Sequence, residues 1–118
     1  GCGGSPQSLL TAQPWQVVSI NGAAVDPDHP ATLQFNADGL FGGQGACNQF
    51  TSSYQLDGES LSTKAVAATL RACMDPLMQQ DQQMFDLLQH LHRFDLDEQG
   101  NLLLISSDDR RIVAKPQE

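Results

Sequence analysis

Apolar and polar residues alternate along most of this chain, in short runs that end near Gly, Pro, Asn or Asp. Alternation with a period of two is typical of β-strands that bury one face and expose the other. The pattern therefore predicts a fold built mainly from short strands, at positions 15–20, 23–25, 31–35, 40–45, 50–56, 61–66, 93–97, 102–105 and 111–114.

Turn-forming pairs and glycines separate these strands. Asn21-Gly22 tolerates the positive φ angles of a tight hairpin, and Asp57-Gly58 marks a second turn. The run 40–45 becomes rich in glycine, which indicates a bulge, a bend or the close approach of another backbone. A phosphate-binding loop is not predicted there, because no Gly-Lys-Ser/Thr sequence follows.

One stretch, from Asp75 to about position 90, has the periodicity of a helix. Asp75 is expected to cap the free N–H groups at its start, and Pro76 suits the first turn, where its missing donor is not needed. Asp81 falls on the apolar face, and we expect it near solvent, where the helix dipole favours a negative charge. The other residues on or beside that face are apolar: Leu77, Met84, Phe85, Leu87, Leu88 and Leu91.

The length and the pattern together indicate one domain. Residues 1–12 show no periodicity, so we predict a flexible N-terminal tether there and a single domain over residues 13–118. A chain of 118 residues is long enough for one modest core. Trp15, the only tryptophan, is expected to anchor that core, with an indole N–H that needs a partner. No apolar run approaches the roughly 20 residues that a membrane-spanning helix needs.

The charge balance narrows the classes of partner. The chain has 6 Lys and Arg against 14 Asp and Glu, for a formal net charge of -8. This excess argues against nucleic acid, since binding there depends on basic side chains that neutralise phosphates. It also argues against electrostatic attachment to an anionic lipid surface. We expect the acidity to serve solubility, and an acidic face that captures a basic partner is the alternative.

The chain has three cysteines, an odd number that would leave one thiol unpaired in an oxidising compartment. Cys2 is the odd one, because it follows Gly1 and precedes a short polar stretch at the start of the chain. A small residue followed by Cys looks like the processed end of a bacterial lipoprotein signal, which predicts lipidation of Cys2. The alternative is a disordered start with a spare thiol.

The other two cysteines, Cys47 and Cys73, then remain as a pair. A bridge between them would close a loop of about 27 residues and contribute about 3–4 kcal/mol in the chain-entropy model. Such a bridge persists in the periplasm, whereas disulfides are rare in the cytosol. The alternative is two buried free thiols that pack as small apolar side chains.

Two motifs surround these cysteines. Gly-Ala-Cys-Asn-Gln-Phe covers residues 45–50, with Tyr54 further on, and Thr-Leu-Arg-Ala-Cys covers residues 69–73 ahead of the predicted helix. The pair resembles the META domain of HslJ-like heat-inducible bacterial lipoproteins, whose pattern is Gly-Cys-Asn-x-Phe/Tyr followed by Thr-x-Met-Ala-Cys. The resemblance covers nearly the whole predicted domain. This chain departs from the pattern at Ala46, where glycine is usual, and at Arg71, where methionine is usual.

The resemblance implies an α+β fold, in which a curled antiparallel sheet approaches an open barrel and one α-helix packs against it. It also implies a location in the bacterial cell envelope, at the outer membrane or in the periplasm, and a link to stress response and secretion. It supplies no reaction. The motif residues become candidates for structural or binding roles: Gly45, Asn48, Phe50, Tyr54, Thr69 and Arg71.

Catalytic and metal chemistry find little support in the sequence. No metal site is predicted, because His90 and His92 would point about 200° apart on a helix, unlike the i, i+4 histidine pair of zinc proteases. No cofactor is expected. A thiol enzyme that uses Cys47 or Cys73 would need a partner base that the sequence does not indicate. We interpret Asn48 as bonding to the backbone near the bridge, and direct contact with a ligand is the alternative.

The favoured hypothesis is a non-catalytic, lipid-anchored envelope domain, linked to stress response, that binds or stabilises a partner protein. The alternative is a small ligand-binding or inhibitory domain that uses the open end of the sheet or its loops. Nucleic acid is not an expected partner, and membrane contact is expected only through a lipid at Cys2. A filled interior would favour the first hypothesis, and a deep apolar pocket with convergent polar groups would favour the second.

Overall fold

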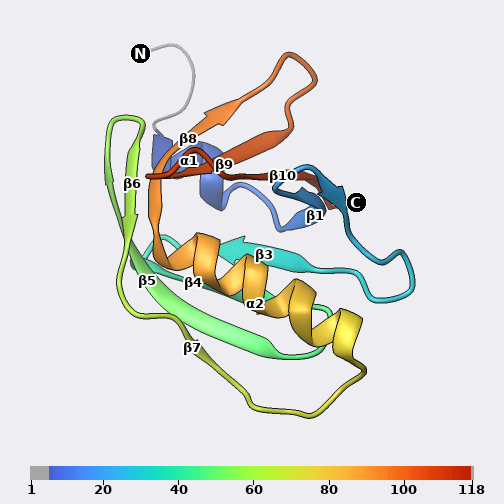
Figure 1. The fold of residues 1–118 in the computed structure, drawn as a ribbon. Coiled ribbons are helices and arrows are strands. Elements are labelled where there is room, and N and C mark those ends of the chain that lie inside the picture. Colours follow the sequence, from blue (N-terminus) through green and yellow to red (C-terminus); the bar gives the residue numbers. More distant parts are fainter. Residues whose placement is uncertain (1–5, 118) are drawn as a thin grey trace.

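The computed structural model describes residues 6–117, and an antiparallel β-barrel dominates it (Figure 1). The elements follow the predicted order, with the strands at slightly different bounds. In chain order they are α1 (Pro6–Thr11), β1 (Trp15–Ile20), β2 (Ala23–Ala24), β3 (Thr32–Phe35), β4 (Leu40–Gln44), β5 (Gln49–Asp57), β6 (Ser60–Thr63), β7 (Ala67–Ala68), α2 (Asp75–Gln89), β8 (Leu91–Leu96), β9 (Leu102–Ser106) and β10 (Arg111–Pro116).

Eight of the described strands form the barrel wall, in the order β10-β9-β8-β6-β5-β4-β3-β1. β1 also pairs with β10, from Trp15 opposite Pro116 to Ile20 opposite Ile112, and this pairing closes the ring. The sequence predicts a sheet that only approaches an open barrel. This detail is wrong, because β10 continues to Pro116 and is long enough to pair along the whole of β1. The predicted α+β class is confirmed.

A row of aromatic rings runs through the barrel interior. Phe35 stacks on Phe41 with ring centroids 5.1 Å apart, and Phe41 meets Phe50 edge-on at 5.8 Å. Phe50 in turn contacts Phe85 of α2 at 5.2 Å. Aromatic pairs of this kind add about 0.5–1.5 kcal/mol each beyond their area burial. Fully or almost fully buried aliphatic side chains surround them: Val17, Ile20, Leu33, Leu61, Leu88, Leu102, Leu104 and Ile112.

The prediction of a flexible tether over residues 1–12 is wrong for its second half. α1 occupies Pro6–Thr11, and Leu10 is fully buried in the core. The indole N–H of Trp15 finds its partner here, since it donates to the backbone oxygen of Leu10 at 3.1 Å. With six residues, α1 is too short for a helical repeat to stand out, and tertiary packing stabilises it. Cys2 lies outside the described residues.

α2 lies where β6 and β8 diverge. These strands share the register pair Ser60 and Arg93, and Thr63 at the end of β6 donates its hydroxyl hydrogen to the backbone oxygen of Leu88 at 2.6 Å. α2 also packs against β1 and β10, and its Phe85 contacts Phe50 of β5, so the helix covers the barrel core. None of the helices within residues 6–117 is long and apolar enough to cross a membrane.

The start of α2 differs in one detail from the prediction. Met74, in an extended conformation, occupies the N-cap position, and no side chain caps the helix there. Asp75 lies in the first turn together with Pro76. The expectation that Asp75 caps the helix is therefore wrong. Its negative charge is still favourable at this position, because it lies near the positive end of the helix dipole.

A polar network ties the turn between β9 and β10 to α2. Ser106, which is almost fully buried, donates its hydroxyl hydrogen to Asp108. The Nε of Arg110 lies 3.0 Å from both carboxylate oxygens of Asp108, and its Nη1 donates to Asp86 of α2 at 2.8 Å. The Ser106 hydroxyl, followed by the Arg110 guanidinium, lowers the pKa of Asp108 to about 2.

This network predicts a specific acid sensitivity. The pKa of Asp108 is about 2 in the folded protein, below its ordinary value of 3.8, so its contribution to stability is present above about pH 4 and is lost as the pH falls toward about 2. We expect Asp108→Asn to reduce the loss of the thermal midpoint between neutral and acid pH. Asp109→Asn, in the same turn, is the control, and an equally steep acid loss in both variants would contradict the prediction.

Candidate functional site

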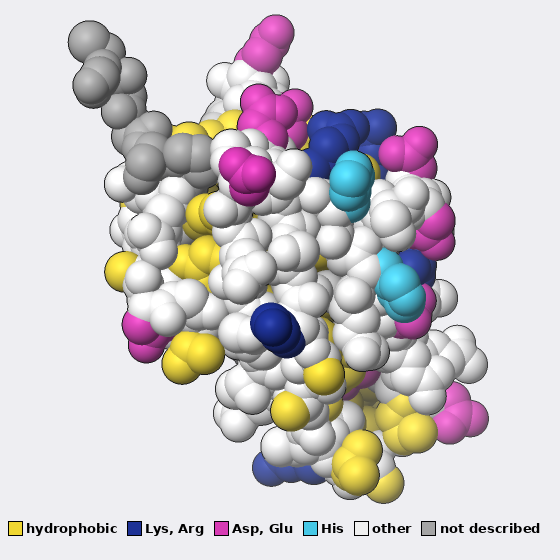
Figure 2. Space-filling model, turned by 90° about the vertical axis from the view of Figure 1, so that its left-hand side faces the viewer, with side chains coloured by type: hydrophobic (Ala, Val, Ile, Leu, Met, Phe, Trp, Pro, Cys, Tyr) yellow, Lys and Arg dark blue, Asp and Glu magenta, His cyan; other side chains and the backbone are white. Residues whose placement is uncertain are grey.

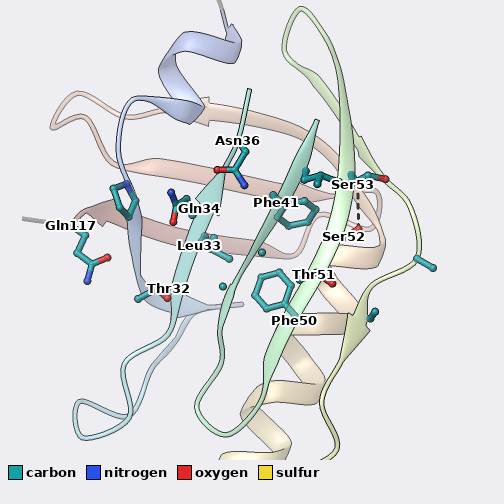
Figure 3. Close-up of a pocket in the computed structure, with 16 residues that line it drawn as sticks. Thr32, Leu33, Gln34, Asn36, Phe41, Phe50, Thr51, Ser52, Ser53 and Gln117 are labelled. Carbon is teal, nitrogen blue, oxygen red and sulfur yellow. Dashed lines mark hydrogen bonds between the residues drawn. The ribbon is translucent and has the colours of Figure 1, made fainter. Parts of the chain in front are cut away.

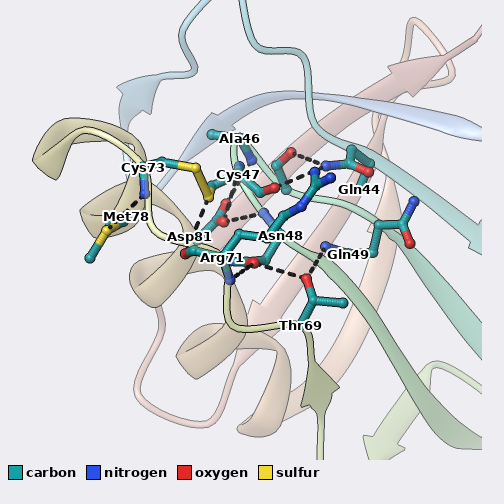
Figure 4. The surroundings of a disulfide bond; sticks show 11 residues. Gln44, Ala46, Cys47, Asn48, Gln49, Thr69, Arg71, Cys73, Met78 and Asp81 are labelled. Carbon is teal, nitrogen blue, oxygen red and sulfur yellow. Dashed lines mark hydrogen bonds between the residues drawn. A yellow bond between two sulfur atoms is a disulfide. The ribbon is translucent and has the colours of Figure 1, made fainter.

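The predicted disulfide is present. Cys47, in the connection between β4 and β5, is bonded to Cys73, in the loop between β7 and α2, with a Cα–Cα distance of 6.2 Å (Figure 4). Both sequence motifs therefore meet at one place, which we call the disulfide junction, defined as residues 45–49, 69–73 and Asp81. Neither sulfur is available as a free thiolate while the bond is intact.

A buried carboxylate organises the junction. Asp81 of α2 is 3% exposed, and it accepts hydrogen bonds from three successive backbone N–H groups: Ala46 at 2.6 Å, Cys47 at 3.1 Å and Asn48 at 2.7 Å. The expectation that Asp81 lies near solvent is wrong. Burial of a charge is costly in isolation, and three charge-assisted hydrogen bonds offset that cost here.

Gly45 and Ala46 fit around this carboxylate. A Cβ atom at Gly45 would overlap the Asp81 carboxylate, and the Gly45 N–H donates to the Asn48 backbone oxygen at 2.7 Å to close a tight turn. Glycine is therefore required at position 45 by the close approach of α2. Ala46 replaces the usual glycine without conflict, because its side chain packs with Cys47 and Leu77.

Asn48 holds the loop between β7 and α2 to the connection between β4 and β5. Its Oδ1 accepts hydrogen bonds from the Thr69 hydroxyl at 2.8 Å and from the Arg71 backbone N–H at 2.7 Å. The backbones of Gln49 and Thr69 are joined as well, since the Thr69 N–H donates to the Gln49 oxygen at 3.0 Å. The interpretation of Asn48 as a residue that bonds to the backbone near the bridge is confirmed, and its carboxamide oxygen is occupied.

The six motif candidates separate into two groups. The first group lies at the junction and consists of Gly45, Asn48, Thr69 and Arg71. Arg71 takes part there through its backbone N–H, while the residue itself is exposed. Phe50 and Tyr54 lie in the barrel core instead, 2% and 5% exposed, and the Tyr54 hydroxyl donates to the Asn36 backbone oxygen. Neither aromatic side chain is therefore free to contact a ligand, whereas the Arg71 side chain is.

The outer side of the junction is an apolar surface that the motif search missed. Leu70 is 98% exposed and Met74 is 69% exposed. Leu70 also lines a cavity of about 320 Å³, between residues 68–72 and the α2 side chains of Met78, Gln82 and Phe85. Figure 2 shows apolar side chains gathered at the lower end of the visible face, the end where Figure 1 places the loop between β7 and α2. We call Leu70, Met74 and this cavity the loop surface.

Metal chemistry finds no set of ligands in the described part of the chain. Within residues 6–117 no group of three or more His, Cys, Asp or Glu side chains is placed to hold a metal ion. His90 faces Asp86 instead, with its Nδ1 2.8 Å from the Asp86 backbone oxygen. What the junction does show is that its disulfide and the hydrogen bonds of Asn48 hold two loops in fixed positions.

Comparison with known proteins agrees with this architecture. A closed antiparallel barrel with one main helix, in which two cysteine motifs meet at a disulfide, defines a small α+β barrel domain. The family model for the META domain matches residues 8–118, and the chain belongs to the META domain family. Among curated proteins, none matches this sequence.

Solved structures share the fold. An NMR structure of a protein from Burkholderia xenovorans is 21% identical with a TM-score of 0.73, covering 94% of this chain and 86% of that one. A second NMR structure is also 21% identical, with a TM-score of 0.73 and coverage of 93% and 94%. A crystal structure of a DUF4847 family protein from Bacteroides vulgatus is 16% identical, with a TM-score of 0.69 and coverage of 95% and 99%. At these identities the likeness concerns the fold alone.

The buried carboxylate gives a direct test of the junction. We expect Asp81→Asn to lower the free energy of unfolding by about 2–4 kcal/mol, because an amide nitrogen would replace one of the oxygens that accept these N–H groups. Chemical denaturation measures the change. Asp75→Asn, in the first turn of the same helix, is the matched control and should cost about 1 kcal/mol or less. Equal losses in the two variants would contradict this role for Asp81.

The disulfide gives a second test. We expect Cys73→Ser to lower the free energy of unfolding by about 2–5 kcal/mol under oxidising conditions, the usual cost of losing a native bridge. A reducing agent should destabilise the natural protein by a similar amount and leave the variant unchanged. Identical denaturation midpoints for the natural protein and the variant, both without reductant, would show that the bridge adds no stability.

Proposed function

We propose that this chain is a non-catalytic domain of the bacterial cell envelope that acts by binding a protein partner. In this proposal the domain is lipid-anchored through Cys2 and takes part in the response to stress. The disulfide supports the location, because such bonds persist in the periplasm and are rare in the cytosol. Membership of the META family and the resemblance to heat-inducible lipoproteins support the link to stress.

The filled interior supports a binding surface on the outside of the barrel. The aromatic row and the aliphatic side chains around it occupy the barrel, and α2 packs over them with Met84, Leu87 and Leu88 almost fully buried. A small-molecule site of the usual kind is a concave pocket that buries most of its ligand. With the interior occupied, an end-on ligand site of the lipocalin type is disfavoured, and surface contacts become the main route to function.

The observation that carries the proposal is the preordered loop surface. Single exposed apolar residues are common on proteins, but Leu70 lies between Thr69 and Arg71, which are both hydrogen-bonded to Asn48. The bridge at Cys73 fixes the same loop from its other end. A partner therefore meets an apolar side chain whose backbone is already ordered, which reduces the entropic cost of association.

Site-directed photo-crosslinking tests the proposal. A photoreactive residue in place of Leu70, in the full chain expressed in bacteria, should give a discrete crosslinked protein band, whereas one in place of exposed Gln55 on β5 should not. Leu70→Ala should weaken binding of the purified partner by about tenfold, as expected for an apolar anchor, and should change stability by about 0.5 kcal/mol or less. Crosslinking at both positions, or at neither, would contradict a partner at the loop surface.

A further inference from the structure

A second surface lies on the outer face of β3, β4 and β5 and shares no residue with the loop surface. It is a groove of about 810 Å³ (Figure 3). This volume falls within the range of about 300–1,000 Å³ that is usual for small-molecule sites. The groove is not part of the loop surface, and the inference drawn from it does not depend on the proposed protein partner.

The floor of the groove is a row of three outward positions across the sheet. Gln34 on β3 lies opposite Gly42 on β4, and Gly42 lies opposite Thr51 on β5. Because glycine has no side chain, the row has a gap between two polar side chains. The gap is fixed, since a Cβ atom at Gly42 would lie 2.7 Å from the Phe50 backbone oxygen and would force β4 and β5 apart.

The two walls of the groove are held by backbone hydrogen bonds. Pro14 and Gln117 form one wall, and the Gln117 N–H donates to the Pro14 oxygen at 3.0 Å. Ala65 and Ala67 form the other wall, and the N–H of neighbouring Lys64, which does not line the groove, donates to the Ser53 oxygen at 3.1 Å. The groove is therefore preformed by paired strands and needs no rearrangement to accept a ligand.

The lining is polar but carries no charge. In a chain of which 17% of residues are charged, no Asp, Glu, Lys, Arg or His is found among the groove residues. The polar groups are hydroxyls and carboxamides, which both donate and accept hydrogen bonds, from Thr32, Gln34, Thr51, Ser53 and Gln117. A phosphate, a carboxylate or an ammonium group would find no opposite charge here, so the groove is matched to a neutral ligand rich in hydrogen-bonding groups.

Two classes of neutral ligand carry many hydrogen-bonding groups, a polar peptide and a sugar, and the strand pairing around the groove decides between them. An extended peptide binds to a sheet chiefly by pairing with an unpaired strand edge. At this place β3 is paired with β4 along its whole length and with β1 at Thr32 and Leu33, and β5 is paired by β4 on one edge and by β6 and β7 on the other. Only side-chain hydroxyls and amides remain to be bound, together with small apolar contacts from Pro14, Leu40 and Ala65 that suit the C–H faces of a sugar ring.

We propose that the groove over β3, β4 and β5 binds an uncharged oligosaccharide. Its hydroxyls would exchange hydrogen bonds with Gln34 and Thr51 on either side of the bare Gly42 floor. The net charge of -8 on the rest of the chain disfavours anionic glycans in the same place. The protein would then have two separate binding surfaces, an apolar one at the disulfide junction and a neutral polar one on the barrel wall.

Amide chemical shifts of the nitrogen-15-labelled protein test this proposal. The probes are cellohexaose, maltohexaose and chitohexaose as neutral sugars, oligogalacturonate as an anionic one, and a Gly-Ser-Gln peptide. At least one neutral sugar should shift the amides of β3–β5 around Gly42, with a dissociation constant of about 1 mM or below. The proposal is overturned if none of the three neutral sugars does so, or if the peptide or the anionic sugar binds the groove more tightly.

An isosteric pair of variants tests the location. Gln34 and Gln55 are both exposed strand glutamines, and Gln55 lies on β5 outside the groove. Gln34→Glu should weaken sugar binding about fivefold or more, because it removes an amide donor from the floor, whereas Gln55→Glu should leave it unchanged. Equal weakening in both would overturn the assignment. Leu70→Ala should not affect sugar binding, so the result is independent of the protein partner.

Discussion

The hydrogen bonds of one buried carboxylate determine how the two halves of this domain meet. Asp81 lies on the apolar face of α2. It accepts hydrogen bonds from the backbone N–H groups of residues 46–48, which precede it by 33 to 35 positions in the chain. In the protein interior, where the dielectric constant is low, these hydrogen bonds are strong. A buried carboxylate oxygen or N–H group left without a partner would lower the stability of the fold. The helix therefore packs in one register against the β4–β5 turn, and the position of Cys47 follows from that register.

The disulfide and Asn48 extend this constraint to the loop between β7 and α2. Once residues 46–48 are fixed, Cys47 reaches Cys73, and the Asn48 oxygen reaches Thr69 and Arg71. Each bond restrains a different point of the same loop, so together they leave it little freedom. A leucine on a mobile loop would lose backbone entropy on binding, whereas the backbone on both sides of Leu70 is already restrained in the folded protein. The link between fold and proposed function is therefore the ordering of this loop.

Local signals in the sequence predicted the parts of the structure that depend on neighbouring residues. The run from Trp15 to Ile20 is a strand with these bounds, and Asn21 and Gly22 adopt φ angles of 49° and 86°, as their turn chemistry requires. The cysteine pair was also predictable, because setting Cys2 aside leaves only Cys47 and Cys73, and the role of Asn48 followed from the tendency of asparagine to bond to nearby backbone. These features need only short-range preferences or a choice among few cysteines.

Contacts between distant residues could not be predicted in the same way. From the amphipathic pattern alone, Asp81 is a polar residue on an apolar helix face. The pattern contains no information about the N–H donors that another loop supplies to this carboxylate. Closure of the barrel depends on the register of β1 against β10, at opposite ends of the chain, and the row of Gln34, Gly42 and Thr51 arises only from the register of three strands. Such features are set by the assembled sheet.

Within the second motif, residues 69–73, some residues hold the loop in place and others leave their side chains free. Its threonine and cysteine, Thr69 and Cys73, are engaged in the hydrogen bond and the disulfide that hold the loop. The META motif does not specify the residue at position 70, and Arg71 contributes only its backbone N–H, which donates a hydrogen bond to the Asn48 side chain. Side chains at 70 and 71 can therefore change without loss of the scaffold. Under the proposed binding role, Arg71 in place of the usual methionine would alter the preference for a partner rather than the fold, since it adds a positive charge beside exposed Leu70 in an acidic protein.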